Sequence, residues 1–125
     1  MTGVAMLMVG GARSCSVSVS PATVTGTGFT GSPNGNVSAT TGAATVTVTG
    51  TGTFAYAWAH VSGDNAGINS PAAAATTFTR LAGAGSSVGG SSRTYSGVFR
   101  CTVTQSGVSR TVDVTVQTTH TYTGP

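Results

Sequence analysis

The sequence contains no lysine and no glutamate, and only 6% of its 125 residues are charged. Soluble domains average roughly 25% charged residues. Five arginines stand against two aspartates, for a formal net charge of +3 at pH 7, and the arginines are scattered along the chain. A nucleic-acid-binding protein usually gathers its basic residues on one face or one element. The composition therefore predicts no nucleic-acid partner, and a surface with so little charge is suited to contact other protein.

Residues able to bind metals or carry out catalysis are few. His60 and His120 lie far apart in the sequence, as do Cys15 and Cys101. Zinc sites need clustered His, Cys, Asp or Glu, and a calcium site needs about six oxygen ligands. Asp64 has an ordinary explanation, because aspartate side chains bond the nearby backbone in turns. No serine lies in a nucleophile elbow. We therefore expect no metal, no cofactor and no enzymatic activity.

Long hydrophobic runs are also missing. The apolar stretch 4–9 has no basic segment before it and is shorter than the roughly 7 to 15 residues of a signal-peptide core. It is far shorter than the about 20 residues that a membrane-spanning helix needs. Two cysteines do not make a disulfide framework. We expect no membrane association, and synthesis in a reducing cytoplasm with Cys15 and Cys101 as free thiols.

Glycine, threonine and serine are abundant, and they occur in short runs that alternate with apolar residues. Runs of period two that end at Gly, Pro or Asn predict β-strands, and threonine favours extended backbone because its Cβ is branched. The stretches 26–42, around Pro33, Asn34 and Gly35, and 81–92 are predicted as loops, the first with an alternative as a weak hairpin. The repeats 25–28 and 49–52 are expected in turns or linkers. No helical period is present, so the predicted fold class is all-β, with strands at 16–20, 44–49, 54–60, 76–80, 95–104 and 110–117.

Alternation within the strands assigns one face of each to the core. Ser106 and Gly107 predict a two-residue hairpin turn between the last two strands, which places Arg100 opposite Asp113. The first strand ends at Pro21 and is predicted to lie at a sheet edge. The expected core residues are Val46, Val48, Tyr56, Trp58, Phe99, Cys101, Val103, Val112, Val114 and Val116.

Four stretches, 56–59, 61–64, 69–71 and 98–104, resemble the immunoglobulin-like domains found in tailed-bacteriophage virion proteins. Immunoglobulin-like sandwiches place a buried Trp on one central strand and a Cys on a strand packed near it, as Trp58 and Cys101 would be here. The resemblance covers residues 16 to about 117. It implies an immunoglobulin-like antiparallel β-sandwich with extended N- and C-terminal segments: an N-terminal arm at 1–14, one domain at 15–117 and a C-terminal tail at 118–125.

Two positions depart from the pattern of antibody domains. Val46 stands where such a domain has its first Cys, so the resemblance implies no disulfide between the sheets. Phe99 stands where the tyrosine corner would have its Tyr, so that hydroxyl-to-backbone bond cannot form. Packing alone is then expected to hold the sheets together.

The resemblance implies a non-enzymatic structural accessory protein of a bacteriophage virion, made in the host cytoplasm and either decorating the capsid or attached to the tail. Expected partners are other virion proteins, in a homo-oligomer or lattice. The predicted assembly contact is apolar and would add a strand to a neighbour or lie in its groove; it consists of Val4, Met6, Leu7, Met8 and Val9. The alternative is that both chain ends fold back on their own sandwich.

A second hypothesis is an adhesion module that binds host-surface glycans. Aromatic side chains in loops usually provide the platform for a sugar ring. Because Trp58 is expected in the core, the aromatic candidates are Tyr95, Tyr122 and Phe29.

Overall fold

The structure, a computed structural model, describes residues 5–9, 13–32, 35–84 and 89–123, with side chains from Ser16 onward. Within these ranges every regular element is a β-strand and no helix occurs, which confirms the all-β prediction. The strands are β1 (Ala5–Val9), β2 (Arg13–Ser20), β3 (Thr23–Thr30), β4 (Asn36–Thr40), β5 (Ala44–Thr49), β6 (Ala55–Gly63), β7 (Gly67–Ile68), β8 (Ala75–Thr76), β9 (Phe78–Gly83), β10 (Ser92–Gln105) and β11 (Val108–Tyr122).

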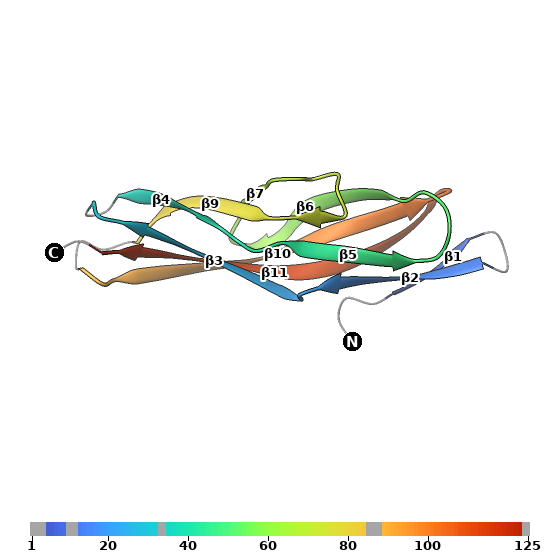
Figure 1. The fold of residues 1–125 in the computed structure, drawn as a ribbon, viewed down its shortest axis with the longest axis horizontal. Helices are drawn as coiled ribbons and strands as arrows, with labels where there is room; N and C mark the ends of the chain where they lie inside the picture. Colours follow the sequence, from blue (N-terminus) through green and yellow to red (C-terminus); the bar gives the residue numbers. More distant parts are fainter. Residues whose placement is uncertain (1–4, 10–12, 33–34, 85–88, 124–125) are drawn as a thin grey trace.

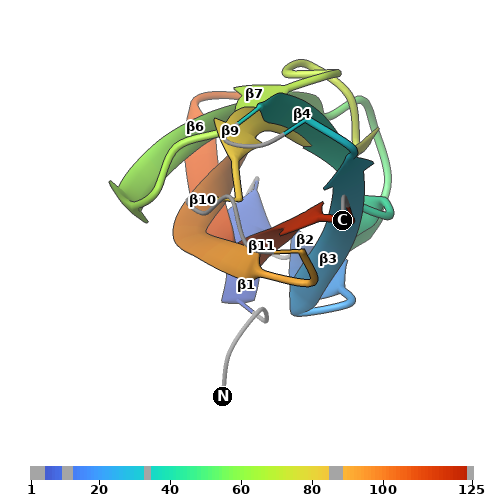
Figure 2. The ribbon, with the colours of Figure 1, turned by 90° about the vertical axis from the view of Figure 1, so that its left-hand side faces the viewer.

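The strands form three sheets with the orders β1-β2-β5-β8, β3-β11-β10-β6 and β4-β9-β7. Only a few residues separate β4 from β5, and likewise β8 from β9. Because β4 pairs with β9 and β5 pairs with β8, the third sheet continues the first, and the two form one layer with a break between them. Seen along the long axis of the molecule, β4, β9 and β7 lie across from β3, β11 and β10 (Figure 2). This arrangement of all-β layers is consistent with a β-sandwich.

The chain changes sheets between β2 and β3. β2 ends at Ser20, which is joined to Pro21 by a cis peptide bond, and β3 then runs in the other sheet. There it lies parallel to β11, while the other strand pairs are antiparallel. The consecutive strands β2 and β3 therefore belong to opposite layers.

The Thr-Gly repeat at 25–28, expected in a turn or linker, lies within β3. A Cβ atom at Gly26 would overlap the backbone of Thr40, and one at Gly28 would overlap the backbone of Ser38. Glycine in a strand often marks a place where another backbone approaches closely. The two glycines of the repeat are therefore explained by packing, because a side chain at either position would prevent β3 from lying so close to β4.

The long β10–β11 hairpin has the predicted register. Arg100 lies opposite Asp113, and the two-residue turn between the strands consists of Ser106 and Gly107. Both turn residues have positive φ, 51° and 78°. A type I′ turn needs positive φ at both central positions, and its twist matches that of the flanking strands.

The core lies between the layers and contains the residues predicted for it. Trp58 is buried, at 5% exposure, and Cys101, directly opposite it on β10, is fully buried. Val48 and Tyr56 are partly buried and pack against the core cluster. The buried cluster consists of Val17, Val24, Ala44, Val46, Trp58, Phe78, Phe99, Cys101, Val103, Val112, Val114 and Val116.

Both predicted domain boundaries fall inside strands. β2 begins at Arg13 and is flanked by β1 as well as β5, so it is not an edge strand and Cys15 lies within it rather than before it. β11 continues to Tyr122, and the side chains of Thr118, His120 and Tyr122 are buried. Residues 118–122 of the expected tail therefore continue a strand, because every second side chain there still faces the interior.

The expected loops are shorter in the structure. β3 and β4 occupy most of 26–42, although they lie in different sheets and do not form a paired hairpin. The tip at Pro33 and Asn34 lies outside the described residues, as do 85–88 within the loop predicted at 81–92. The strand predicted at 76–80 is present as β8 and β9, separated by Thr77.

Candidate functional site

β1 contains most of the predicted assembly contact. It pairs antiparallel with β2, with Ala5 opposite Val17 and Val9 opposite Arg13, and it is the last strand of its sheet. Val4 lies outside the described residues. The backbone of Met6, Leu7, Met8 and Val9 is thus bonded along one edge to the chain's own β2, while no strand pairs with the other edge in the described part of the chain, although β11 lies close to β1.

The ribbon of β1 and β2 extends past the rest of its sheet. β5 pairs with β2 only over Ser16–Ser20, whereas β1 pairs with it over 13–17. β1 lies at one end of the long axis, and the C-terminal half of β11 lies at the other (Figure 1). The segments predicted as arm and tail therefore belong to opposite ends of the molecule.

Hydroxyl side chains form cross-strand rows on the outer face of β10 and β11. The Thr94 and Thr119 hydroxyls are 3.0 Å apart, and those of Ser92 and Thr121 are 2.7 Å apart. The Arg100 guanidinium binds the Asp113 carboxylate through two hydrogen bonds, of 2.8 and 3.2 Å. This is the only ion pair in the described residues, so the face is nearly neutral and rich in hydrogen-bonding groups.

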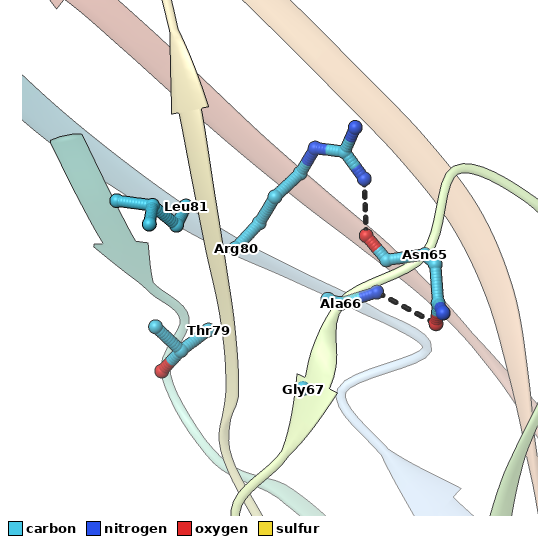
Figure 3. Close-up of a pocket in the computed structure, with 6 residues that line it drawn as sticks. All are labelled: Asn65, Ala66, Gly67, Thr79, Arg80 and Leu81. Atoms are coloured by element: carbon cyan, nitrogen blue, oxygen red, sulfur yellow. Dashed lines mark hydrogen bonds between the residues drawn. The ribbon is translucent and has the colours of Figure 1, made fainter. Parts of the chain in front are cut away.

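A shallow groove of about 340 Å³ lies between the segment that follows β6 and strand β9 (Figure 3). Its lining includes Asn65, Ala66 and Gly67 on one side and Thr79, Arg80 and Leu81 on the other. Arg80 donates a hydrogen bond through Nη1 to the backbone carbonyl of Asn65, which links the two sides of the groove. Leu81 is 66% exposed beside the groove.

Arg80 also lies against Tyr95 of β10. The Arg80 guanidinium carbon is 4.2 Å from the centroid of the Tyr95 ring, and that of Arg93 is 5.8 Å from the same centroid. The Tyr95 hydroxyl donates to the backbone carbonyl of Gly83 at 3.1 Å. A cation over an aromatic face is attracted by the ring quadrupole. The Tyr95 ring is therefore within reach of two guanidinium groups.

His120 lies behind this cluster and is fully buried. Its Nδ1 is 3.1 Å from the carbonyl oxygen of Val37, so it carries the proton and donates, while Nε2 is 3.0 Å from the hydroxyl of Thr118 and accepts. Burial lowers the pKa of His120 and the charge of Arg80 lowers it further, while the hydrogen bond to the Val37 carbonyl and the nearby backbone of Ala82 oppose the shift. The ring is a neutral link between β11 and β4.

The remaining candidates for catalysis or metal binding are the two cysteines and His60. Cys101 is a buried free thiol whose pKa burial raises to about 11, and the side chain of Cys15 is not described. His60 lies on β6, is exposed, and has Nε2 3.0 Å from the Gly63 carbonyl oxygen. No group of three or more His, Cys, Asp or Glu that could hold a metal ion occurs among the described residues.

The three aromatic candidates for sugar binding are not equivalent. Tyr122 is buried, at 2% exposure, because it ends the inward-facing row of β11. Tyr95 is partly buried, with its ring beneath Arg80. Phe29 is 63% exposed on β3 and is the most exposed of the three.

No protein-family model matches this chain, and neither curated proteins nor solved structures give a significant match. In the described part of the chain, no helix has the length and apolar character needed to cross a bilayer.

The cluster around Tyr95 was not found by sequence reasoning. Arg80 lies on β9 whereas Arg93 and Tyr95 lie on β10, and arginines scattered in sequence gave no sign of a shared location. The one available signal was that Arg93 and Tyr95 are two residues apart, which places them on the same face of a strand.

Proposed function

We propose that this protein is a non-enzymatic structural module of a bacteriophage virion, with an immunoglobulin-like sandwich as its scaffold and β1 as its attachment to the assembly. Three features support the scaffold. Trp58 and Cys101 face each other across β6 and β10. β2 pairs in one sheet while β3 pairs with the last strand of the other. The sheets are held by packing, with a valine at position 46.

The outer edge of β1 is the observation that carries the proposal. An edge strand presents unpaired N–H and C=O groups, which monomeric proteins usually protect with charged residues or proline. Residues 1–12 contain no charged residue and no proline, since the first charge is Arg13 and the first proline is Pro21. A two-stranded ribbon is also marginally stable alone. An added strand from a neighbouring protein would complete the backbone hydrogen bonds of β1.

The surface outside β1 supports the same role. The face of β10 and β11 is nearly neutral and carries rows of hydroxyl groups. Such a face has little charge to repel a neighbour in a lattice. The partners in this proposal are other virion proteins, which include further copies of this chain, on the capsid or the tail.

Incorporation into particles tests the proposal. Deleting residues 1–11 should leave a folded sandwich, with an intact near-ultraviolet signal from Trp58, that no longer enters particles. Leu7→Lys should have the same effect, because lysine in an edge strand opposes pairing with another strand, whereas Leu7→Val should incorporate normally. Normal incorporation of the truncated protein would refute the role of β1.

A second candidate function is adhesion to surface glycans. The groove beside Arg80, with two arginines on one tyrosine ring, favours it. Phe29, exposed at the end of β3, is the aromatic group available to a sugar ring. Binding of the full chain to a glycan array, lost on substitution of Arg80 and retained on deletion of residues 1–11, would separate this function from assembly.

A further inference from the structure

The apolar core stops short of the end of the molecule where β4 and the last residues of β11 lie (Figure 1). On β11 the core cluster ends at Val116, and on β9 it includes only Phe78. Regions with few buried apolar contacts open locally at a lower free energy than the core of a domain. We call this region the His120 end; its buried residues are Ala39, Ala82, Ala84, Thr118, His120 and Tyr122.

Two side chains of the second sheet bind the backbone of the third sheet at the His120 end. His120 of β11 donates from Nδ1 to the Val37 carbonyl of β4 at 3.1 Å, and the Tyr95 hydroxyl of β10 donates to the Gly83 carbonyl of β9 at 3.1 Å. The His120 ring also lies edge-on to the Tyr95 ring, with the centroids 5.2 Å apart. A ribbon of two short strands is marginally stable alone. Because β7 has only two residues, β4 and β9 depend on their contacts with the second sheet.

A proton added to His120 would disturb the hydrogen bonds around its ring. In the neutral ring Nε2 accepts from the Thr118 hydroxyl, 3.0 Å away. A protonated Nε2 must donate to the Thr118 oxygen instead, and the hydroxyl hydrogen then needs a new acceptor. Thr118 is buried, and no second hydrogen bond joins its hydroxyl to a described residue. An unpaired polar group in the interior costs free energy.

The charged groups around His120 oppose the same proton. Arg93 lies directly opposite His120 in the β10–β11 pairing, and like charges at such positions are destabilising. Burial and then the charge of Arg80 on β9 lower the pKa of His120. The other titratable groups at this end are Tyr95 of β10 and Tyr122 of β11, while β3 and β4 have no titratable or charged side chain. Neither arginine is ion-paired with a described residue, so a charged His120 would be a third cation with no carboxylate bound.

We propose that His120 makes this end of the sandwich an acid-sensitive device: when the ring takes up a proton, β4 and β9 separate from β11, while the core around Trp58 and Phe99 stays folded. In the open state, water satisfies the charged ring and the Thr118 hydroxyl. The device uses none of β1, which lies at the opposite end of the long axis (Figure 1). A module attached through β1 would thereby change its free end without detaching, and the device does not require that attachment.

Amide hydrogen exchange of the full chain between pH 7 and pH 5, corrected for the intrinsic pH dependence of exchange, tests this proposal. Opening takes up one proton, so protection of the amides in β4 and in 79–83 should fall about tenfold for each pH unit below about 6.5, until the closed form is itself protonated. Amides in 99–103 and 112–116 should keep their protection. His120→Gln, which is neutral at every pH, should abolish the fall. His60→Gln, at an exposed histidine of β6, is the matched control and should leave the fall in place.

Nuclear magnetic resonance of the His120 ring in the unmodified chain is a second measurement, which does not depend on whether His120→Gln folds. The ring nitrogens should show a neutral ring protonated at Nδ1 at pH 7, and the signals of the charged ring should appear in step with the loss of protection in β4. A ring that stays neutral while protection falls would overturn the proposal. Protection that falls equally in all strands would mean global unfolding and would overturn it too, as would protection of β4 that does not change with pH.

Discussion

Trp58→Ala should remove the largest single contribution to the core. The Trp58 ring packs edge-on against Phe78 at a centroid distance of 5.7 Å, and Phe78 in turn lies 4.8 Å from Phe99. Replacing a buried Trp by Ala costs about 3 to 5 kcal/mol, out of a total stability of about 5 to 15 kcal/mol for an ordinary domain. With an m-value of about 2 kcal/mol/M, the urea midpoint should fall by about 2 M.

Trp58 also secures the loop between β7 and β8. Its Nε1–H donates to the Ala73 carbonyl at 2.8 Å and its backbone N–H to the Pro71 carbonyl at 2.9 Å. Trp58→Phe keeps an aromatic ring but removes the first bond, so it should destabilise the protein by less than Trp58→Ala. It should also speed amide exchange within residues 70–74.

The control is Ala59→Ser, at an exposed position next to Trp58 on β6. Urea unfolding of the three variants, followed by circular dichroism, provides the measurement. A Trp58→Ala midpoint equal to that of Ala59→Ser would refute the placement of Trp58 in the core. Unchanged exchange in Trp58→Phe would refute its role in holding the loop.

Three further predictions concern charge and protonation. The Arg100–Asp113 pair is exposed on both sides, so a double-mutant cycle to alanine should give a small coupling energy that disappears in 1 M salt; a coupling that persists in high salt would contradict this. The pKa of His120 is lowered in the folded state, so the unfolded state binds more protons and the free energy of unfolding should fall as pH drops below about 6.5. His120→Gln should flatten this fall between pH 7 and 5, whereas His60→Gln should not. An unchanged slope in His120→Gln would exclude His120 as the group responsible. The Cys101 thiol, with its pKa raised to about 11, should resist thiol reagents at pH 8 until the protein unfolds. The denatured protein, without reductant, should then show two reactive thiols. Finding none would mean that the two cysteines form a disulfide.

The β10–β11 hairpin could be predicted in detail because its signals are local. The turn residues Ser106 and Gly107 set the loop length, and alternation then fixes both the inward face and the Arg100–Asp113 pair. Trp58 and the valines were assigned to the core for the same reason, since period two decides the face of a strand.

The rest of the fold depends on long-range pairing that local patterns do not encode. The 25–28 repeat looks like linker sequence, yet its glycines are required by the neighbouring backbone of β4. The strand predicted at 110–117 continues to Tyr122, because the polar side chains of Thr118 and His120 bond to each other and His120 bonds to β4 in the interior. Arg80 and Tyr95 meet only because the chain crosses between layers after Gly63.

Cross-linking from β1 in assembled particles is the most direct test of whether this strand attaches the protein to the virion. A photoreactive amino acid at position 7, followed by mass spectrometry of the linked chains, identifies what lies against the outer edge of this strand. If β1 attaches the protein to the virion, position 7 should link to another virion protein or to a second copy of this chain, and the same probe at Ala59 on β6 should give fewer links. Links from position 7 that stay within a single copy, in particles that contain the protein, would show that β1 is not the attachment strand.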